Sequence, residues 1–193
     1  MNPALGEKVV ERLWPDGKLN RLVLAKEANV LIRELGLEDD VPEGTEFIAV
    51  PTDGIGPDHP LSGEKLSRVV ALYRAKDYDD AKAISACILA HQGAGHSIGI
   101  HTARDERAVE LGQTIPTCRV IVNQAHCFAT GGSFNNGLPF SLSMGCGSWG
   151  GNSIDENLHW KHFMDITKVV REIDPVEPGL EEVFGDYWAR TGK

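Results

Sequence analysis

The sequence has 193 residues, 41% hydrophobic and 24% charged, which suffices for one good core and a small appendage. A net charge of -9 at pH 7 argues against a nucleic-acid surface, because phosphate binding needs clustered Lys and Arg residues that the sequence lacks. The sequence has no bilayer-length apolar run and no basic start followed by one, so we expect neither membrane insertion nor secretion.

The first part of the chain is predicted to be helical and then to form a strand. A helix is expected from Pro3 until the breaking sequence WPDG begins at Trp14, because apolar residues recur at helical spacing. A second helix is predicted over residues 27–35, with Gly36 placed to end it. The β-rich run EFIAV (residues 46–50) follows, and then the loop PTDGIGPDHPLSG, a type of segment that often carries function.

From residue 68 onward, predicted strands alternate with predicted helices. Strands are expected in RVVALYRA (residues 68–75), HSIGIHT (residues 96–102) and CRVIV (residues 118–122). Helices are expected over residues 77–93 and around Val109. Because such alternation is best satisfied by a parallel sheet covered on both faces, the sequence predicts an α/β fold.

The end of the chain differs from this core. The run FMDITKVVREI (residues 163–173) is predicted to be extended. From Pro178 onward, apolar residues fall at helical spacing, which predicts a helix that docks on the domain or on a partner. We therefore divide the chain into a main domain over residues 1–173 and a tail over residues 174–193.

The four cysteines lack the spacings that are typical of metal sites or of a disulfide framework; they are Cys87, Cys118, Cys127 and Cys146. Their pattern predicts a reducing, cytoplasmic environment and no metal site. Cys146 lies in the glycine-rich stretch SMGCGSWGGNS, where a thiol near backbone N–H groups could act as a nucleophile. The alternative is structural: the glycines allow tight backbone packing, and the small thiol fills a gap.

Glu64 and His96 are also open to a functional and to a structural interpretation, and His101 is the better candidate from sheet topology alone. Glu64 follows the loop and precedes a strand, where its carboxylate could hold ribose hydroxyls or remain solvated. His96 begins a predicted strand, whereas His101 ends it, and ligands in open α/β sheets gather at the carboxyl ends of strands. The sequence contains neither a GxxxxGK[ST] phosphate loop nor a GxGxxG fingerprint after a strand.

Three motifs taken in order are more specific: HPLSGEKLSRVVALYRAKD, QGAGHSIGIHT and LPFSLSMGCGSWGGNSIDENLHWKHF. Together they resemble the CoA-acylating branch of the aldehyde dehydrogenase superfamily over residues 20–173. The resemblance implies a three-layer catalytic domain built on a parallel sheet, with the extended residues 163–173 pairing with a neighbouring subunit. A homo-oligomer that acts on a small aldehyde is therefore expected, with NAD or NADP as cofactor and coenzyme A as co-substrate.

The resemblance also implies roles for individual residues. Glu64 matches the acid that holds the nicotinamide ribose, and Leu66 would pack beside the ring. His96 matches the histidine of the GHS/GHT motif, which takes a proton. Cys146 and Gly147 match a glycine-rich motif near the substrate pocket that does not supply the nucleophile.

The attacking cysteine of such enzymes lies upstream of the Glu-Lys-Leu-Ser motif, behind a Rossmann-type cofactor domain. Because no cysteine precedes Cys87, we expect a later portion of the catalytic domain. Arg68 departs from the family pattern, in which proline usually follows the motif, and this puts the nicotinamide geometry in question. The alternatives are a binding or assembly module without turnover, and a hydrolase that uses Cys146 with His96 or His101.

Overall fold

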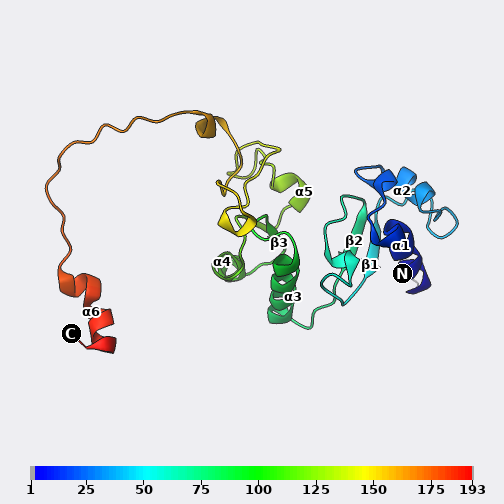
Figure 1. The fold of residues 1–193 in the computed structure, drawn as a ribbon, viewed down its shortest axis with the longest axis horizontal. Helices are drawn as coiled ribbons and strands as arrows, with labels where there is room; N and C mark the ends of the chain where they lie inside the picture. Colours follow the sequence, from blue (N-terminus) through cyan, green and yellow to red (C-terminus); the bar gives the residue numbers. More distant parts are fainter. Residues whose placement is uncertain (1–2, 193) are drawn as a thin grey trace. The chain divides into compact units, whose positions relative to one another are not determined.

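The computed structural model describes residues 3–192 and separates into two compact units, Met1–His159 and Trp160–Lys193 (Figure 1). The helices and strands of the first unit are α1 (Pro3–Leu13), α2 (Ala28–Glu34), β1 (Ile48–Pro51), β2 (Val69–Leu72), α3 (Tyr78–His91), β3 (Ile98–Ile100), α4 (Asp105–Thr114), β4 (Val120–Val122) and α5 (His126–Ala129). Short 3-10 helices are η1 (Pro15–Gly17), η2 (Arg21–Val23), η3 (Pro60–Ser62) and η4 (Ser148–Gly150). Every helix and strand predicted before residue 123 is present.

The strands pair in parallel, which confirms the predicted α/β class. β1 pairs with β2 in the register Ile48↔Val69, and β3 pairs with β4 in the register Ile98↔Val120. The expected sheet is present as two separate two-stranded ladders within residues 3–192. Helix α4 makes the crossover from β3 to β4, whereas a loop with the short turn η3 connects β1 to β2.

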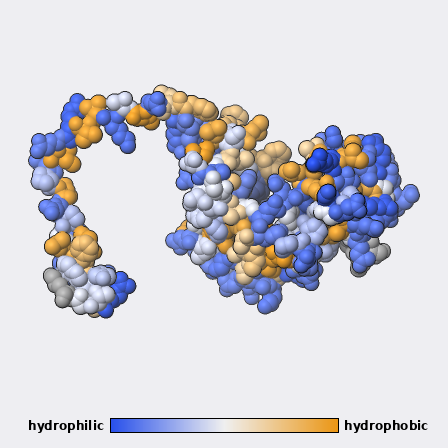
Figure 2. Space-filling view, in the orientation of Figure 1, coloured by the Kyte–Doolittle hydropathy of each residue, from blue (hydrophilic) through white to orange (hydrophobic). Residues whose placement is uncertain are grey.

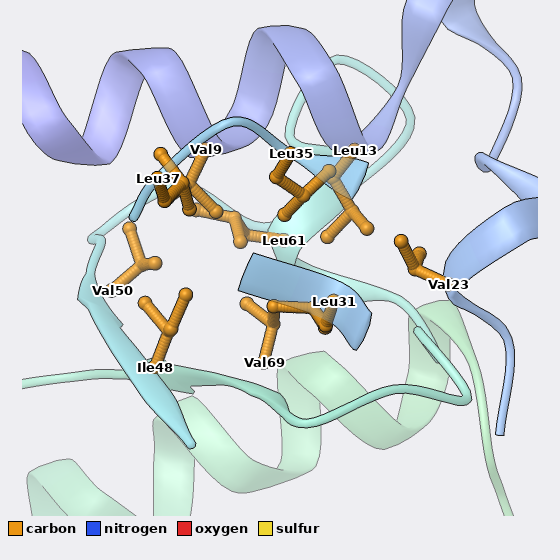
Figure 3. Close-up of a cluster of buried hydrophobic side chains, with 10 residues drawn as sticks. All are labelled: Val9, Leu13, Val23, Leu31, Leu35, Leu37, Ile48, Val50, Leu61 and Val69. Carbon is orange, nitrogen blue, oxygen red and sulfur yellow. The ribbon is translucent and has the colours of Figure 1, made fainter. Parts of the chain in front are cut away.

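The hydrophobic core lies between α1, α2, β1 and β2. Ten buried side chains form it, and Figure 3 shows them converging: Val9, Leu13, Val23, Leu31, Leu35, Leu37, Ile48, Val50, Leu61 and Val69. Val9 and Leu13 lie one helical turn apart and point into the cluster, as the spacing predicted. Burial of each such side chain stabilises the fold by about 2 kcal/mol. The core therefore anchors η3 and β2, which carry one wall of the pocket described below.

Helix α2 ends at Glu34, and Gly36 lies just beyond it, as expected. This residue has a φ of +56°, a left-handed conformation that glycine adopts without a steric penalty. The Arg12 guanidinium donates hydrogen bonds to the carbonyls of Leu35 and Gly36, and a Cβ on Gly36 would lie 2.5 Å from its Nη1. Gly36 therefore allows both the left-handed turn after α2 and the close approach of the Arg12 side chain from α1.

The second unit contains η5 (Trp160–Phe163) and α6 (Leu180–Thr191). The predicted tail helix is confirmed. Residues 164–179 between them form neither a helix nor a strand, and Figure 1 shows them as an open trace. No helix within residues 3–192 combines the length and the apolar composition that crossing a bilayer requires.

Candidate active site

A pocket of about 820 Å³ lies in the first unit between the η3 turn, β2, the end of α3 and the glycine loop at η4. Glu64, His96 and Cys146 all line it, although they lie far apart in the sequence. Leu66 and Gly147 are adjacent in sequence to lining residues and do not line it themselves. Its volume lies within the range of pockets that hold drug-sized ligands, about 300–1,000 Å³.

Glu64 is fixed through a hydrogen bond of its backbone N–H, and its side-chain carboxylate is exposed. The Glu64 N–H donates to Oε1 of Gln92 at 2.7 Å, so the turn after η3 is attached to the end of α3. A Cβ on Gly63 would lie 2.6 Å from the same oxygen, which explains the glycine there. Within residues 3–192 the carboxylate of Glu64 has neither a hydrogen bond nor an ion pair, so it can accept hydrogen bonds from a ligand.

The residues after Glu64 build the turn. Lys65 Nζ donates to the carbonyls of Leu61 and Gly63, each at 2.7 Å, and burial lowers the pKa of this ammonium group. Leu66 has a φ of +42°, a conformation that costs a non-glycine residue about 1 kcal/mol. The Leu66 side chain is exposed, and its carbonyl accepts a hydrogen bond from the Ala25 N–H. Arg68, the departure from the family pattern, forms an ion pair with Glu27.

His96 faces the pocket from the turn between α3 and β3. Its Nδ1 lies 2.7 Å from Ser97 Oγ, and that hydroxyl lies 2.8 Å from Nε2 of His126. The other nitrogen of His96, Nε2, has no partner in the described part of the chain and remains available to a ligand. His101, at the other end of β3, does not line the pocket. The expectation from sheet topology that His101 would be the better candidate is not supported by this placement.

The glycine loop around Cys146 packs against the turn before β3. A Cβ on Gly95 would lie 1.9 Å from the Cys146 carbonyl oxygen, and one on Gly150 would lie 2.4 Å from the Cys146 Cβ. The Cys146 N–H donates to Asn152 Oδ1 at 2.8 Å. Among the residues described, no hydrogen bond joins the Cys146 thiol to a histidine. Gly147 is buried at a φ of +58°, and the loop therefore fits the structural interpretation of its glycines.

Arg119 connects the two sides of this site, although nothing in the sequence beyond its place in the run CRVIV marked it as part of a site. It is 5% exposed, and its Nη1 donates to the carbonyls of His96 at 3.1 Å and Gly145 at 2.9 Å. Its Nε donates to Oδ1 of the fully buried Asn157 at 2.9 Å, while Nη2 is buried without a partner in the described chain. Arg119 thus holds the His96 turn against the glycine loop.

Known proteins resemble this chain along nearly its whole length. The acylating sulfoacetaldehyde dehydrogenase of Cupriavidus necator is 46% identical over 181 residues, 94% of this chain and 37% of that protein. The acylating sulfoacetaldehyde dehydrogenase of Bilophila wadsworthia is 37% identical, with 97% of this chain and 41% of that protein covered. The acetylating succinate-semialdehyde dehydrogenase of Clostridium kluyveri is 35% identical, with 93% and 39% covered.

Solved structures agree with these relatives. An acetylating aldehyde dehydrogenase from Geobacillus thermoglucosidasius superimposes with a TM-score of 0.77 at 27% identity, covering 91% of this chain and 39% of that chain. A probable aldehyde dehydrogenase from Listeria monocytogenes gives a TM-score of 0.81 at 26% identity, covering 95% and 39%. No protein-family model matches the chain. The chain spans about two fifths of the length of the curated relatives it matches.

Proposed function

The chain belongs to the CoA-acylating aldehyde dehydrogenases as a partial segment of them, and on that premise we propose that it forms the catalytic-domain portion of an NAD(P)-dependent enzyme. The complete enzyme would oxidise a small aldehyde to an acyl-CoA. The observation that carries the proposal is the single pocket lined by Glu64, His96 and Cys146, which come from three separate motifs. The relatives are named for sulfoacetaldehyde and succinate semialdehyde, so we propose a short aldehyde with an anionic group as the substrate.

Glu64 is proposed to hold the ribose next to the nicotinamide. Its exposed carboxylate can accept hydrogen bonds from two ribose hydroxyls, and the pocket has room for a nucleoside. The bound cofactor would supply the hydride acceptor for oxidation of the aldehyde. Gln92, which accepts the hydrogen bond from the Glu64 N–H, would keep the carboxylate in place.

His96 is proposed to act as the base in transfer of the acyl group to CoA. We propose that the acyl group is carried as a thioester on a cysteine in the part of the enzyme outside this chain. His96 Nε2 would take the proton of the CoA thiol, and the thiolate would attack the thioester carbonyl. The carbon–sulfur bond to the cysteine would break, and the departing thiolate would receive the proton from His96. Cys146 would form part of the pocket wall.

The role of Glu64 can be tested by titrating the chain with NAD while recording backbone amide NMR shifts. We expect millimolar binding, since most of the cofactor site lies outside this chain, with shifts confined to the amides of pocket-lining residues. Glu64→Gln should weaken this binding about tenfold, because an amide replaces the carboxylate that accepts both hydroxyls. Glu43→Gln, an exposed acid away from the pocket, is the matched control. Equal affinities of the two variants would remove Glu64 from the cofactor site.

We also propose that the enzyme is a cytoplasmic homo-oligomer. All four cysteines are free thiols, which suits a reducing compartment. The segment from Phe163 to Ile173 exposes apolar side chains and has no strand partner within the described residues. Pairing of this segment with another copy of the chain could cover these side chains. Figure 2 shows hydrophobic residues along this segment.

A further inference from the structure

Two histidines flank one serine hydroxyl at the edge of the pocket. His96 Nδ1 and His126 Nε2 lie 2.7 Å and 2.8 Å from Ser97 Oγ. His126 is the first residue of α5, four positions after the end of β4, and His96 comes just before β3. Because β3 and β4 are paired, α5 brings the His126 ring back over the start of β3.

The backbone is shaped to admit this ring. A Cβ on Gly99 would lie 2.6 Å from His126 Nδ1, a distance that real Cβ atoms essentially never show. Thr130 Oγ1 and the Thr130 N–H both lie 3.2 Å from the His126 carbonyl, which fixes the turn of α5 that carries the histidine. The His126 imidazole therefore occupies space that a side chain at position 99 would fill.

A hydroxyl has one proton, and this couples the two rings. While Ser97 donates to one imidazole nitrogen and accepts from the other, only one of His96 Nδ1 and His126 Nε2 carries a proton when both rings are neutral. Burial, and then the nearby charge of His96, lower the pKa of His126, so this ring is harder to protonate than an ordinary histidine.

We propose that His126 is a positioning residue that fixes the tautomer of His96 through Ser97. The direction rests on the proposed function: a base that presents Nε2 to the pocket must carry its proton on Nδ1. Ser97 then accepts from His96 Nδ1–H and donates to His126 Nε2. The same hydrogen bonds are kept when His96 Nε2 gains a proton, so no group has to reorient during proton transfer.

The experiment is nitrogen-15 NMR of the histidine rings in the full 193-residue chain at about pH 8, where ordinary histidines are neutral. Two-bond couplings between ring protons and ring nitrogens distinguish the tautomers. We expect His96 in the wild-type chain to be predominantly the Nδ1–H form. His126→Phe and Ser97→Ala should both shift it toward a mixture with the Nε2–H form, whereas Ser97→Thr should keep it.

Gly99→Ala provides a variant that displaces the His126 ring and deletes no polar atom, and His101→Phe, directly after the same strand, is the control. A shift in Gly99→Ala with none in His101→Phe is expected. The proposal is overturned if wild-type His96 is the Nε2–H form, or if its tautomer is unchanged in Ser97→Ala and His126→Phe. Since the tautomer readout is independent of turnover, a coupled tautomer together with the absence of acyl-CoA from an assembled complex of this chain with the rest of the enzyme would refute the proposed function alone.

Discussion

Single residues in this site act mainly by holding backbone segments together. Arg119 is the clearest example, because it is buried and its guanidinium bonds two carbonyls and one amide oxygen with no carboxylate partner among the ion pairs of the described residues. Asn157 extends the network, donating to the carbonyls of Thr130 at 2.9 Å and Pro139 at 2.8 Å. A charged group that is hydrogen-bonded in this way contributes to stability as long as every partner is kept.

Arg119→Met should therefore destabilise the chain by about 3 kcal/mol, because the carbonyls of His96 and Gly145 lose a charged donor while the apolar stem is retained. Chemical denaturation followed by circular dichroism measures this. Arg74→Met, an exposed arginine outside the network, should change stability by less than about 0.5 kcal/mol. Equal stability of wild type and Arg119→Met would contradict the structural role.

At the scale of elements, the sequence predicted the strands and helices before residue 123 and could not predict the partners of its candidate residues. Hydrophobic spacing and glycine positions mark where elements begin and end, and these signals identified α1, α2 and α3 correctly. Glu64, His96 and Cys146 were singled out as candidates by their places in loop, strand-edge and glycine-rich segments, and motif resemblance then favoured roles for them. Ser97 and His126 were missed, because only the parallel pairing of β3 with β4 brings α5 over Gly99.

The contact between α5 and β3 has a consequence for pH dependence. Burial holds the pKa of His126 below its ordinary value of 6.5, so the unfolded chain binds more protons once the pH falls below that value. The stability attributable to this ring is fully present above about pH 6.5 and is lost as the pH falls through the folded pKa.

Denaturation between pH 5 and 8 checks this. The titratable group that faces His126 is His96, which is linked to it by hydrogen bonds through Ser97. The test therefore compares the slope of stability against pH between variants and does not interpret the slope of one protein alone. His126→Gln should show a weaker loss of stability on acidification than wild type, and the exposed His101→Gln should follow wild type. A slope in His126→Gln identical to that of wild type would rule out the depressed pKa.

At the scale of the whole molecule, apolar surface is left uncovered in a way that fits a portion of a larger enzyme. Val70 and Leu72 on β2 are 49% and 55% exposed, although parallel strands are normally buried on both faces. In the second unit, Val169, Val170 and Ile173 are more than 70% exposed. We expect the remaining part of the enzyme to cover β2 and a second subunit to cover the segment at residues 163–173.

The expected pairing of residues 163–173 with a second subunit can be checked by light scattering after size-exclusion chromatography. The wild-type chain should run as a dimer or larger oligomer, and Val169→Asp should reduce its mass to that of a monomer, because a charge would be buried in the interface. Val176→Asp, also exposed but beyond residue 173, should leave the mass unchanged. A monomeric wild-type chain would show that the segment does not suffice for self-association.

The central claim is that the pocket lined by Glu64, His96 and Cys146 takes part in forming an acyl-CoA. The most direct measurement is to co-express this chain with the Cupriavidus necator relative from which the matching region has been removed. Acyl-CoA produced from sulfoacetaldehyde, succinate semialdehyde or acetaldehyde is then measured by mass spectrometry. We predict CoA- and NAD-dependent product, reduced about a hundredfold by His96→Gln and not by His101→Gln. Absence of product from a complex that assembles, or product that His96→Gln leaves unchanged, would contradict this account.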